Sequence, residues 1–285
     1  MGGQTPDLPL PGDPPYAEVP PPQALADCVL SLWEMRIPSL PLPTRARIMP
    51  NACVDIVMYL SDTSQGEGAA SVVGPPHRSF IVGSTLRSFI MRSAGWRHII
   101  GASLRPAGVL PLLGLPASEI GEALAALHDV IGARASQIED HVFDGPGTGA
   151  LRRLGEALMR LRRPSEAAGD VAQRADLLVR RAYGRRRIDA LAGDLNVSGR
   201  RLERRFLAEL GITPKLFSRL VRFDRMVRDL ARRGTTPWSR FALEHGYTDQ
   251  AHFINEFREF AGLTPSEYEA ETKEQPPTTG PLPDG

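Results

Sequence analysis

GYTDQAHFINEFREFAGLTP, residues 246–265, decides how the second half of the chain folds. A related stretch, VSGRRLERRFLAELGITP, lies 51 residues earlier, at residues 197–214. The earlier copy carries two large apolar residues, Leu202 and Phe206, and the later copy has phenylalanine at both equivalent places. The spacing of four residues puts each pair on one face of a helix. The repeat therefore predicts that one small helical unit is built twice.

The residues that flank each predicted helix indicate how the unit begins and ends. Gly211 and Gly262 follow the two helices and predict left-handed C-caps, and a Thr-Pro pair then begins the next element in both copies. Asn196 and Gly246 precede the two helices, and both residue types tolerate the positive φ of a tight turn between crossing helices. This order is the helix-turn-helix pattern. We expect two such units, joined by a helix over about 214–232.

The face opposite the apolar pair differs between the two copies. At 100° per residue, Arg200 and Arg204 point outward in the first copy with Glu203 beside them. Exposed arginines usually form only a solvated face, but the second helix of such a unit enters the major groove of DNA, where arginine pairs with guanine. The outward residues of the second copy suit adenine and the thymine methyl group instead: Gln250, Ala251, Ile254 and Asn255. Two helices of the same construction that carry different outward residues predict that the protein binds two different short DNA sequences.

These segments resemble the AraC/XylS family of bacterial transcription regulators. GYTDQAHFINEFREFAGLTPSEY is similar to the second helix-turn-helix of that family, and IDALAGDLNVSGRRLERRFLAELGITPKLF is similar to the first. The resemblance covers about residues 184–271 and implies a seven-helix domain whose two recognition helices enter adjacent major grooves. Asn255 stands where many members have arginine, and Tyr247 stands where phenylalanine is commoner.

The resemblance also assigns roles to single residues. The residues that it implies for base contacts are Arg200, Glu203, Arg204, Gln250, Ala251, Ile254 and Asn255. Together with the expected contacts from helix N-termini and flanking arginines, it implies a second set of residues for phosphate contacts. This second set is Ser198, Arg201, Arg205, Asp249 and His252.

Residues 23–145 have a different pattern, in which short β-branched runs alternate with Gly, Pro and Ser. The runs CVDIVMYL, SVVGPP, RSFIVGS, SFIMRSAG and WRHIIGASL predict an antiparallel sheet or small barrel. Two helical pieces follow, AGVLPLLGL and PASEIGEALAALHDVIG, and Ser118 is the expected cap of the second. The predicted fold class is therefore α+β, with a β-rich, cupin-like or small-barrel domain before an all-α domain. IMPNACVDIVMYL and IIGASLRPAGVLPLLGLPASEI resemble the sensor half of an uncharacterised branch of the same family, which implies a sensing or dimerisation domain and no particular ligand.

The remaining segments are predicted to be tails and linkers. Residues 1–22 and 272–285 are rich in proline and glycine, which is typical of disordered tails. Residues 146–183 are predicted to hold linker helices. A leucine stripe there has helical spacing and suits either packing against its own domain or dimerisation: Leu151, Leu154, Leu158 and Leu161.

Composition limits the possible partners and compartments. The chain has 285 residues, a formal net charge of +1 and two cysteines. The overall charge therefore gives no information for or against a polyanionic partner, and the two thiols suggest a reducing compartment. We see no signal peptide and no apolar run of membrane-spanning length, and we expect a cytoplasmic, nucleoid-associated protein without membrane contact. The expected partners are double-stranded DNA, RNA polymerase, a small-molecule effector and a second copy of the chain as a homodimer.

Two other function classes are open to such a chain. A DNA-alkylation repair enzyme would need a reactive cysteine, but Cys53 lies in an apolar run without basic neighbours that would lower its pKa. An architectural DNA binder would rest on Lys and Arg against phosphate, unlike the uncharged outward face of the second unit. The six histidines have no metal-ligand spacing, and we expect no metal, no cofactor and no enzymatic activity. Candidate pocket residues of the first domain are as readily structural: Asp55, Trp96, His98 and Arg105.

Overall fold

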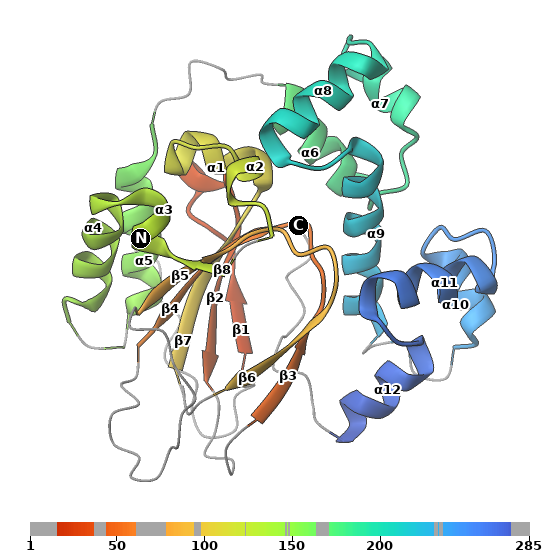
Figure 1. The fold of residues 1–285 in the computed structure, drawn as a ribbon, viewed down its shortest axis with the longest axis horizontal. Helices are drawn as coiled ribbons and strands as arrows, with labels where there is room; N and C mark the ends of the chain where they lie inside the picture. The colour runs from red at the N-terminus through yellow and green to blue at the C-terminus, as the bar shows by residue number, and fades with distance from the viewer. Residues whose placement is uncertain are drawn as a thin grey trace, which may run out of the picture.

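The computed structural model contains a β-rich domain followed by a helical domain (Figure 1), which confirms the predicted α+β class. The residues that the structure describes are 16–36, 44–60, 78–93, 98–122, 124–145, 147, 149–163, 171–230, 233 and 236–274. The predicted strand SVVGPP, Trp96, and most of both predicted tails lie outside these residues.

A six-stranded antiparallel sheet forms the centre of the first domain, and its strand order is β1-β2-β7-β4-β5-β8. Its strands are β1 (Tyr16–Val19), β2 (Val29–Arg36), β4 (Val54–Tyr59), β5 (Ser79–Val82), β7 (His98–Leu104) and β8 (Leu124–Ala126). A short 3₁₀ helix, η1 (Gln23–Leu25), precedes β2. A separate antiparallel pair consists of β3 (Thr44–Ile48) and β6 (Phe89–Ser93). The predicted sheet is thus present, with a second small sheet beside it.

Helices cover one face of the large sheet and close the first core. They are α1 (Pro106–Leu113), α2 (Ala117–Ile120), α3 (Leu127–Ile131), α4 (Ala133–Phe143) and α5 (Ala150–Leu161). Strand β4 alternates buried and half-buried residues, as a strand with one face against a core does. Its residues Ile56 and Met58 are fully buried in one cluster with Leu112, Ile138 and Leu154 from the helices.

The predicted helix over PASEIGEALAALHDVIG is wrong in part. The helix stops after four residues as α2, where Gly121 takes a positive φ of 62°. Residues 124–126 then form β8, because they pair with the edge strand β5, and only afterwards does α3 begin. Ser118 does not cap the helix, whose N-cap is Pro116.

Two boundaries of the first domain also differ from the prediction. Residues 16–19, expected in a disordered tail, form β1 and pair with β2. The stripe of α5 packs inward, with Leu154, Leu158 and Leu161 in the first core and Leu151 half-buried against it. The stripe therefore belongs to its own domain and does not form an exposed dimerisation face, and α5 is part of the first domain rather than a linker.

The second domain contains seven helices within the described residues, as the family resemblance implies. They are α6 (Val171–Arg181), α7 (Ile188–Asp194), α8 (Gly199–Leu210), α9 (Pro214–Leu230), α10 (Trp238–Glu244), α11 (Gln250–Ala261) and α12 (Pro265–Glu274). Helix α6 packs in the second core, so the helical domain begins before residue 184, and α12 extends past residue 271. In Figure 1, α9 runs from the group of α6–α8 to the group of α10–α12.

The turns of both units have the predicted backbone conformation. Asn196 and Gly246, in the turns before α8 and α11, have φ of 54° and 77°. Gly211 and Gly262 cap these two helices with φ of 78° and 74°. An L side chain rarely adopts such angles, so asparagine and glycine are needed at these places.

Candidate DNA-binding surface

Helix α8 is the recognition helix of the first unit. Leu202 and Phe206 are fully buried, and the Phe206 ring packs edge-on against Phe217 of α9 at 5.6 Å between ring centroids. These contacts fix which side of α8 faces the core. The opposite side is exposed and carries the three predicted base-contacting residues Arg200, Glu203 and Arg204.

Helix α11 is the recognition helix of the second unit and has the same construction. Phe253 and Phe257 are fully buried, and Phe257 contacts Phe223 of α9 at 5.5 Å between ring centroids. Of the predicted base-contacting residues, Gln250, Ala251 and Asn255 are exposed. Ile254 is half-buried and packs against the second core, so only part of its side chain faces outward.

Two of the predicted phosphate contacts are N-caps of the recognition helices. The Ser198 hydroxyl accepts a hydrogen bond from the Arg201 amide at 3.2 Å, and the Asp249 carboxylate accepts one from the His252 amide at 2.8 Å. The bond from the His252 amide is the main reason that the pKa of Asp249 lies below its usual value. The structure therefore gives both side chains a role in helix stability that does not involve DNA.

The other three predicted phosphate contacts flank the recognition helices. Arg201 and Arg205 are exposed, and Arg205 forms an i,i+4 ion pair with Glu209 at 3.2 Å. His252 is half-buried and lies 3.1 Å from the Thr248 hydroxyl. These side chains remain near the surface, beside the outward faces described above.

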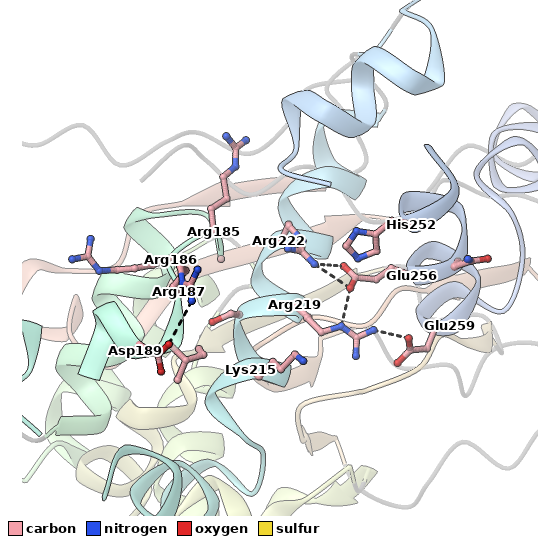
Figure 2. Close-up of a pocket in the computed structure, with 14 residues that line it drawn as sticks. Arg185, Arg186, Arg187, Asp189, Lys215, Arg219, Arg222, His252, Glu256 and Glu259 are labelled. Carbon is pink, nitrogen blue, oxygen red and sulfur yellow. Dashed lines mark hydrogen bonds and ion pairs between the residues drawn. The ribbon is translucent and has the colours of Figure 1, made fainter. Parts of the chain in front are cut away.

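A buried ion-pair network joins α11 to α9, as Figure 2 shows. Glu256 accepts hydrogen bonds from Arg219 Nε at 2.7 Å and from Arg222 Nη2 at 2.9 Å, and Arg219 also bonds Glu259. The Glu256 side chain is only 3% exposed, against 53% for Glu259. Burial alone would raise the pKa of Glu256, but the Arg219 hydrogen bond and the Arg222 charge outweigh it and hold that pKa below its usual range.

This network was missed from the sequence. Glu256 follows the inward Phe253 by three positions, so it lies at the edge of the buried face of α11. A carboxylate at such a place needs a cation nearby, which is the one signal that the sequence offers. The partner, Arg222, is 34 positions earlier, and nothing in the sequence pattern pairs the two.

A cavity of about 790 Å³ lies between the two units, next to this network. The segment before α7 contributes Arg185, Arg186 and Arg187, helix α9 contributes Lys215, and α11 contributes Asn255, among others. Arg185 donates a hydrogen bond to the Glu244 carbonyl at the end of α10, and thus reaches across from the first unit to the second. The cavity is therefore formed by both units and borders the outward face of α11.

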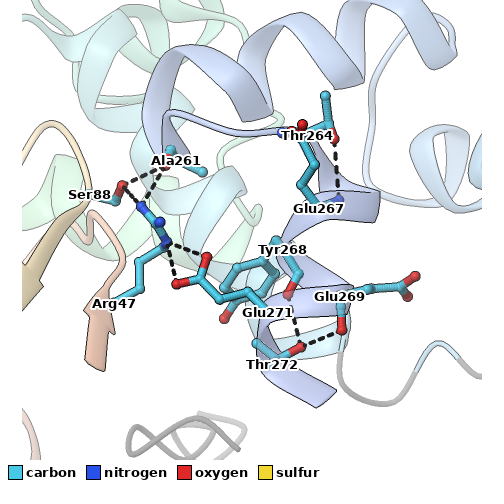
Figure 3. A network of polar contacts seen from close by, with 9 residues as sticks. All are labelled: Arg47, Ser88, Ala261, Thr264, Glu267, Tyr268, Glu269, Glu271 and Thr272. Carbon is cyan, nitrogen blue, oxygen red and sulfur yellow. Dashed lines mark hydrogen bonds and ion pairs between the residues drawn. The ribbon is translucent and has the colours of Figure 1, made fainter. Parts of the chain in front are cut away.

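The β-rich domain contacts the C-terminal end of α11 (Figure 3). The Ser88 amide donates to the Phe260 carbonyl at 2.8 Å, and the Ser88 hydroxyl donates to the Ala261 carbonyl at 2.6 Å. Arg47 of β3 bonds the Glu271 carboxylate of α12 at 3.0 Å and also reaches Ser88. The last carbonyls of a helix have no hydrogen-bond partner within the helix, so these donors supply the hydrogen bonds that the helix itself cannot make.

The same domain also contacts the C-terminal end of α8. The Ser118 hydroxyl of α2 donates to the Ala208 carbonyl at 2.6 Å, which is the role this side chain has in place of the predicted cap. Arg105, at the N-terminal end of α1, bonds the fully buried Asp176 of α6 at 2.8 Å, so Arg105 forms a structural ion pair and is not part of an open pocket. The β-rich domain thus contacts the ends of both recognition helices.

The other candidate residues of the first domain also have structural partners. Asp55 accepts a hydrogen bond from Ser103 at 2.5 Å, and His98 lies 2.5 Å from the Glu34 carboxylate. Burial raises the pKa of the Cys53 thiol to about 12, so this cysteine is not available as a thiolate nucleophile. The cysteine on which a DNA-alkylation repair activity would depend is thus a buried side chain of the first domain.

Comparison with known families supports this description of the second domain. Residues 191–271 match a family described as a helix-turn-helix domain, and residues 17–125 match a domain of unknown function, DUF6597. The chain carries an AraC-type helix-turn-helix domain. It is a DNA-binding transcription regulator. AraC-type regulators are generally not enzymes, and no enzymatic domain is matched.

Solved structures similar to this chain include ToxT from Vibrio cholerae and the transcriptional regulator CdpR from Pseudomonas aeruginosa. ToxT is 12% identical, with a TM-score of 0.41, over 80% of this chain and 97% of that chain. CdpR is 25% identical, with a TM-score of 0.31, over 62% of this chain and 46% of that chain. No curated protein sequence matches the chain. None of the helices in the described residues has the length and apolar character needed to span a bilayer.

Proposed function

We propose that the regulator reads two short DNA sequences in adjacent major grooves, one with α8 and one with α11. The observation that carries this proposal is the shared construction of the two helices. Each is fixed by buried aromatic contacts to α9 and presents an exposed outward face from its first turn onward. Both are held at their C-terminal ends by the β-rich domain, which leaves the N-terminal turns free to enter a groove.

The proposed base contacts differ between the two half-sites. Arg200 and Arg204 suit guanine, whose O6 and N7 accept two hydrogen bonds from one guanidinium, and Glu203 suits the amino group of cytosine. Gln250 and Asn255 suit adenine, while Ala251 and the exposed part of Ile254 suit the thymine methyl group. The centres of two adjacent major grooves are about 34 Å apart, so we expect half-sites at a spacing of about one helical turn.

The proposed phosphate contacts come from Arg201, Arg205 and His252 beside the helices. Ser198 and Asp249 take part through the helix N-termini that they cap, whose amides attract an anion. The Asp249 carboxylate itself repels phosphate, so its contribution is to hold the helix end in place.

We further propose that the β-rich domain modulates DNA binding in response to an effector of small-molecule type. The support is its contact with both recognition helices, through Ser118 for α8 and Ser88 for α11. An effector that changed the relative position of these two residues would change the spacing of the helices. The regulator would act on chromosomal DNA in the cytoplasm and through RNA polymerase. The leucine stripe of α5, which is the sequence feature that favours a homodimer, faces the core of its own domain. A homodimer would therefore need another surface.

In vitro selection of the full chain on randomised duplex DNA tests the proposed readout. We expect two short enriched motifs at a fixed spacing of about one helical turn. A single enriched motif would contradict the use of both helices. Binding without enrichment, repeated after addition of cell metabolite extract as a source of effector, would contradict sequence-specific readout altogether.

A further inference from the structure

We propose that the cavity between the two helix-turn-helix units holds the sugar-phosphate backbone of the DNA that separates the two half-sites, with Arg187 and Lys215 as phosphate ligands. This inference rests on the proposed function, because it takes the two recognition helices to lie in adjacent major grooves. It adds a third contact region, whose two proposed phosphate ligands lie outside both recognition helices.

The cavity lies beside the part of α11 that is proposed to enter the major groove. It is bordered by His252 and Asn255, which lie in the first two turns of α11 beside its outward face. Figure 2 shows His252 on this side of the cavity. The walls of a major groove are the two sugar-phosphate backbones, so residues that flank a recognition helix face phosphates. The far side of the cavity is formed by the residues that lead into α7 of the first unit. DNA that engages both helices therefore has one backbone running past this cavity.

The side chains that line the cavity carry an excess of positive charge. Six cationic side chains line it, against three carboxylates. Glu256 and Glu259 are occupied by Arg219 and Arg222, as described above. Of the lining residues, this leaves four cations with a single carboxylate, that of Asp189. An excess of this kind in a hollow surface attracts a polyanion.

The partners of the four cations decide which are free to bind phosphate. Arg185 bonds the Glu244 carbonyl, and Arg186 pairs with Asp194. Arg187 lies 3.7 Å from Asp189, but both side chains are more than four-fifths exposed, so water screens this pair almost completely. Lys215 is exposed and pairs with no carboxylate in the described part of the chain. Arg187 and Lys215 are therefore the available phosphate ligands.

Salt dependence of DNA binding gives the first test. Arg187→Gln and Lys215→Gln each remove one cation from an exposed side chain, and Arg152→Gln, at a 56% exposed arginine on α5, is the matched control. Affinity is measured for a selected duplex and for an unrelated duplex between about 50 and about 200 mM salt. Each cavity variant should lower the slope of log K against log salt by about 0.9, so the rise in salt should weaken it about 3.5-fold less than wild type.

The two kinds of failure can be told apart. The cavity variants should keep the wild-type preference for the selected duplex, because phosphate contacts carry no sequence information. Wild-type slopes in both variants, with preference intact, would overturn the inference and leave the proposed function standing. Loss of all preference in the wild type would overturn the proposed function, while the slopes would still decide whether the cavity binds DNA.

A second measurement locates the contact on the DNA. Duplexes with uncharged methylphosphonates between the two half-sites lack the charge that the cavity is proposed to bind. Wild type should bind this duplex more weakly than the natural one, whereas the Arg187→Gln Lys215→Gln double variant should bind both equally. The same weakening in wild type and double variant would place these contacts elsewhere and overturn the inference.

Discussion

Replacing Glu256 by alanine should destabilise the helical domain far more than the same change at Glu259, although both carboxylates bind Arg219 from the same helix. The difference lies in burial. The Glu256 side chain is 3% exposed and binds two guanidinium groups, whereas the Glu259 side chain is 53% exposed and binds one. The two substitutions thus remove the same chemical group from two environments.

The magnitude follows from what each change leaves behind. Removal of one partner from a buried ion pair costs about 3 to 5 kcal/mol, because an unpaired charge remains. Without Glu256, Arg222 keeps the Tyr247 ring at 4.7 Å, and Arg219 keeps Glu259. The Arg222 and Arg219 side chains are 15% and 26% exposed, so water also reaches both. We therefore expect Glu256→Ala to lower the free energy of unfolding by about 3 kcal/mol, the low end of this range. Glu259→Ala should lower it by about 0.5 kcal/mol.

Urea unfolding of the full chain, followed by circular dichroism, measures both costs. The pKa of Glu256 is lower in the folded protein than its ordinary value of 4.5. Its contribution is therefore present above pH 4.5 and is lost as pH falls through the folded-state pKa. The gap between wild type and Glu256→Ala should narrow accordingly between about pH 7 and about pH 3. Equal costs for the two variants at neutral pH would refute the argument from burial.

Three further changes test other parts of the molecule. Arg204→Ala should cost about 1–3 kcal/mol of binding to the selected duplex and relax preference at one base; a uniform loss over all sequences would show that Arg204 contacts only phosphate. Arg47→Gln removes the ion pair with Glu271 and should raise amide hydrogen exchange in α12, measured by mass spectrometry; unchanged exchange would show that the contact does not hold the helix. Burial raises the pKa of Glu18 to about 8, so folding should become less favourable as pH rises toward that value. Urea unfolding at about pH 5 and about pH 8.5 should show that Glu18→Gln loses less stability than wild type between these two pH values. An equal loss of stability in both proteins would contradict this role of Glu18.

Local signals explain why the helical domain could be predicted in detail. An apolar pair at i and i+4, a glycine C-cap and a residue that tolerates positive φ each act within a few positions. The left-handed conformations of Asn196 and Gly211 were expected from residue type alone, and the structure has both. Residue contacts with DNA depend on a partner outside the chain, so the base and phosphate assignments remain predictions.

Contacts between distant segments explain where prediction failed. Residues 124–126, Leu-Ala-Ala, have good helix propensity, yet they form β8 because they pair with the edge of the sheet. Ser118 stands where a helix cap is expected, but its hydroxyl binds a carbonyl 90 positions away. The leucine stripe of α5 correctly indicated an apolar face, but spacing does not tell what covers that face.

The contacts made by the β-rich domain suggest how an effector bound to that domain would change DNA binding, although the effector itself does not contact the DNA. Ser118 and Ser88 bind carbonyls at the ends of α8 and α11. The Leu86 amide, two residues before Ser88, donates a hydrogen bond to Glu122, which lies in the turn that follows α2. The two contact points are thus linked within one domain. B-DNA presents adjacent major grooves at a fixed spacing, so a small change in the distance between the two contact points would change how well both helices fit at once. We therefore expect the effector to alter the affinity for two half-sites at their natural spacing more than the affinity for either half-site alone.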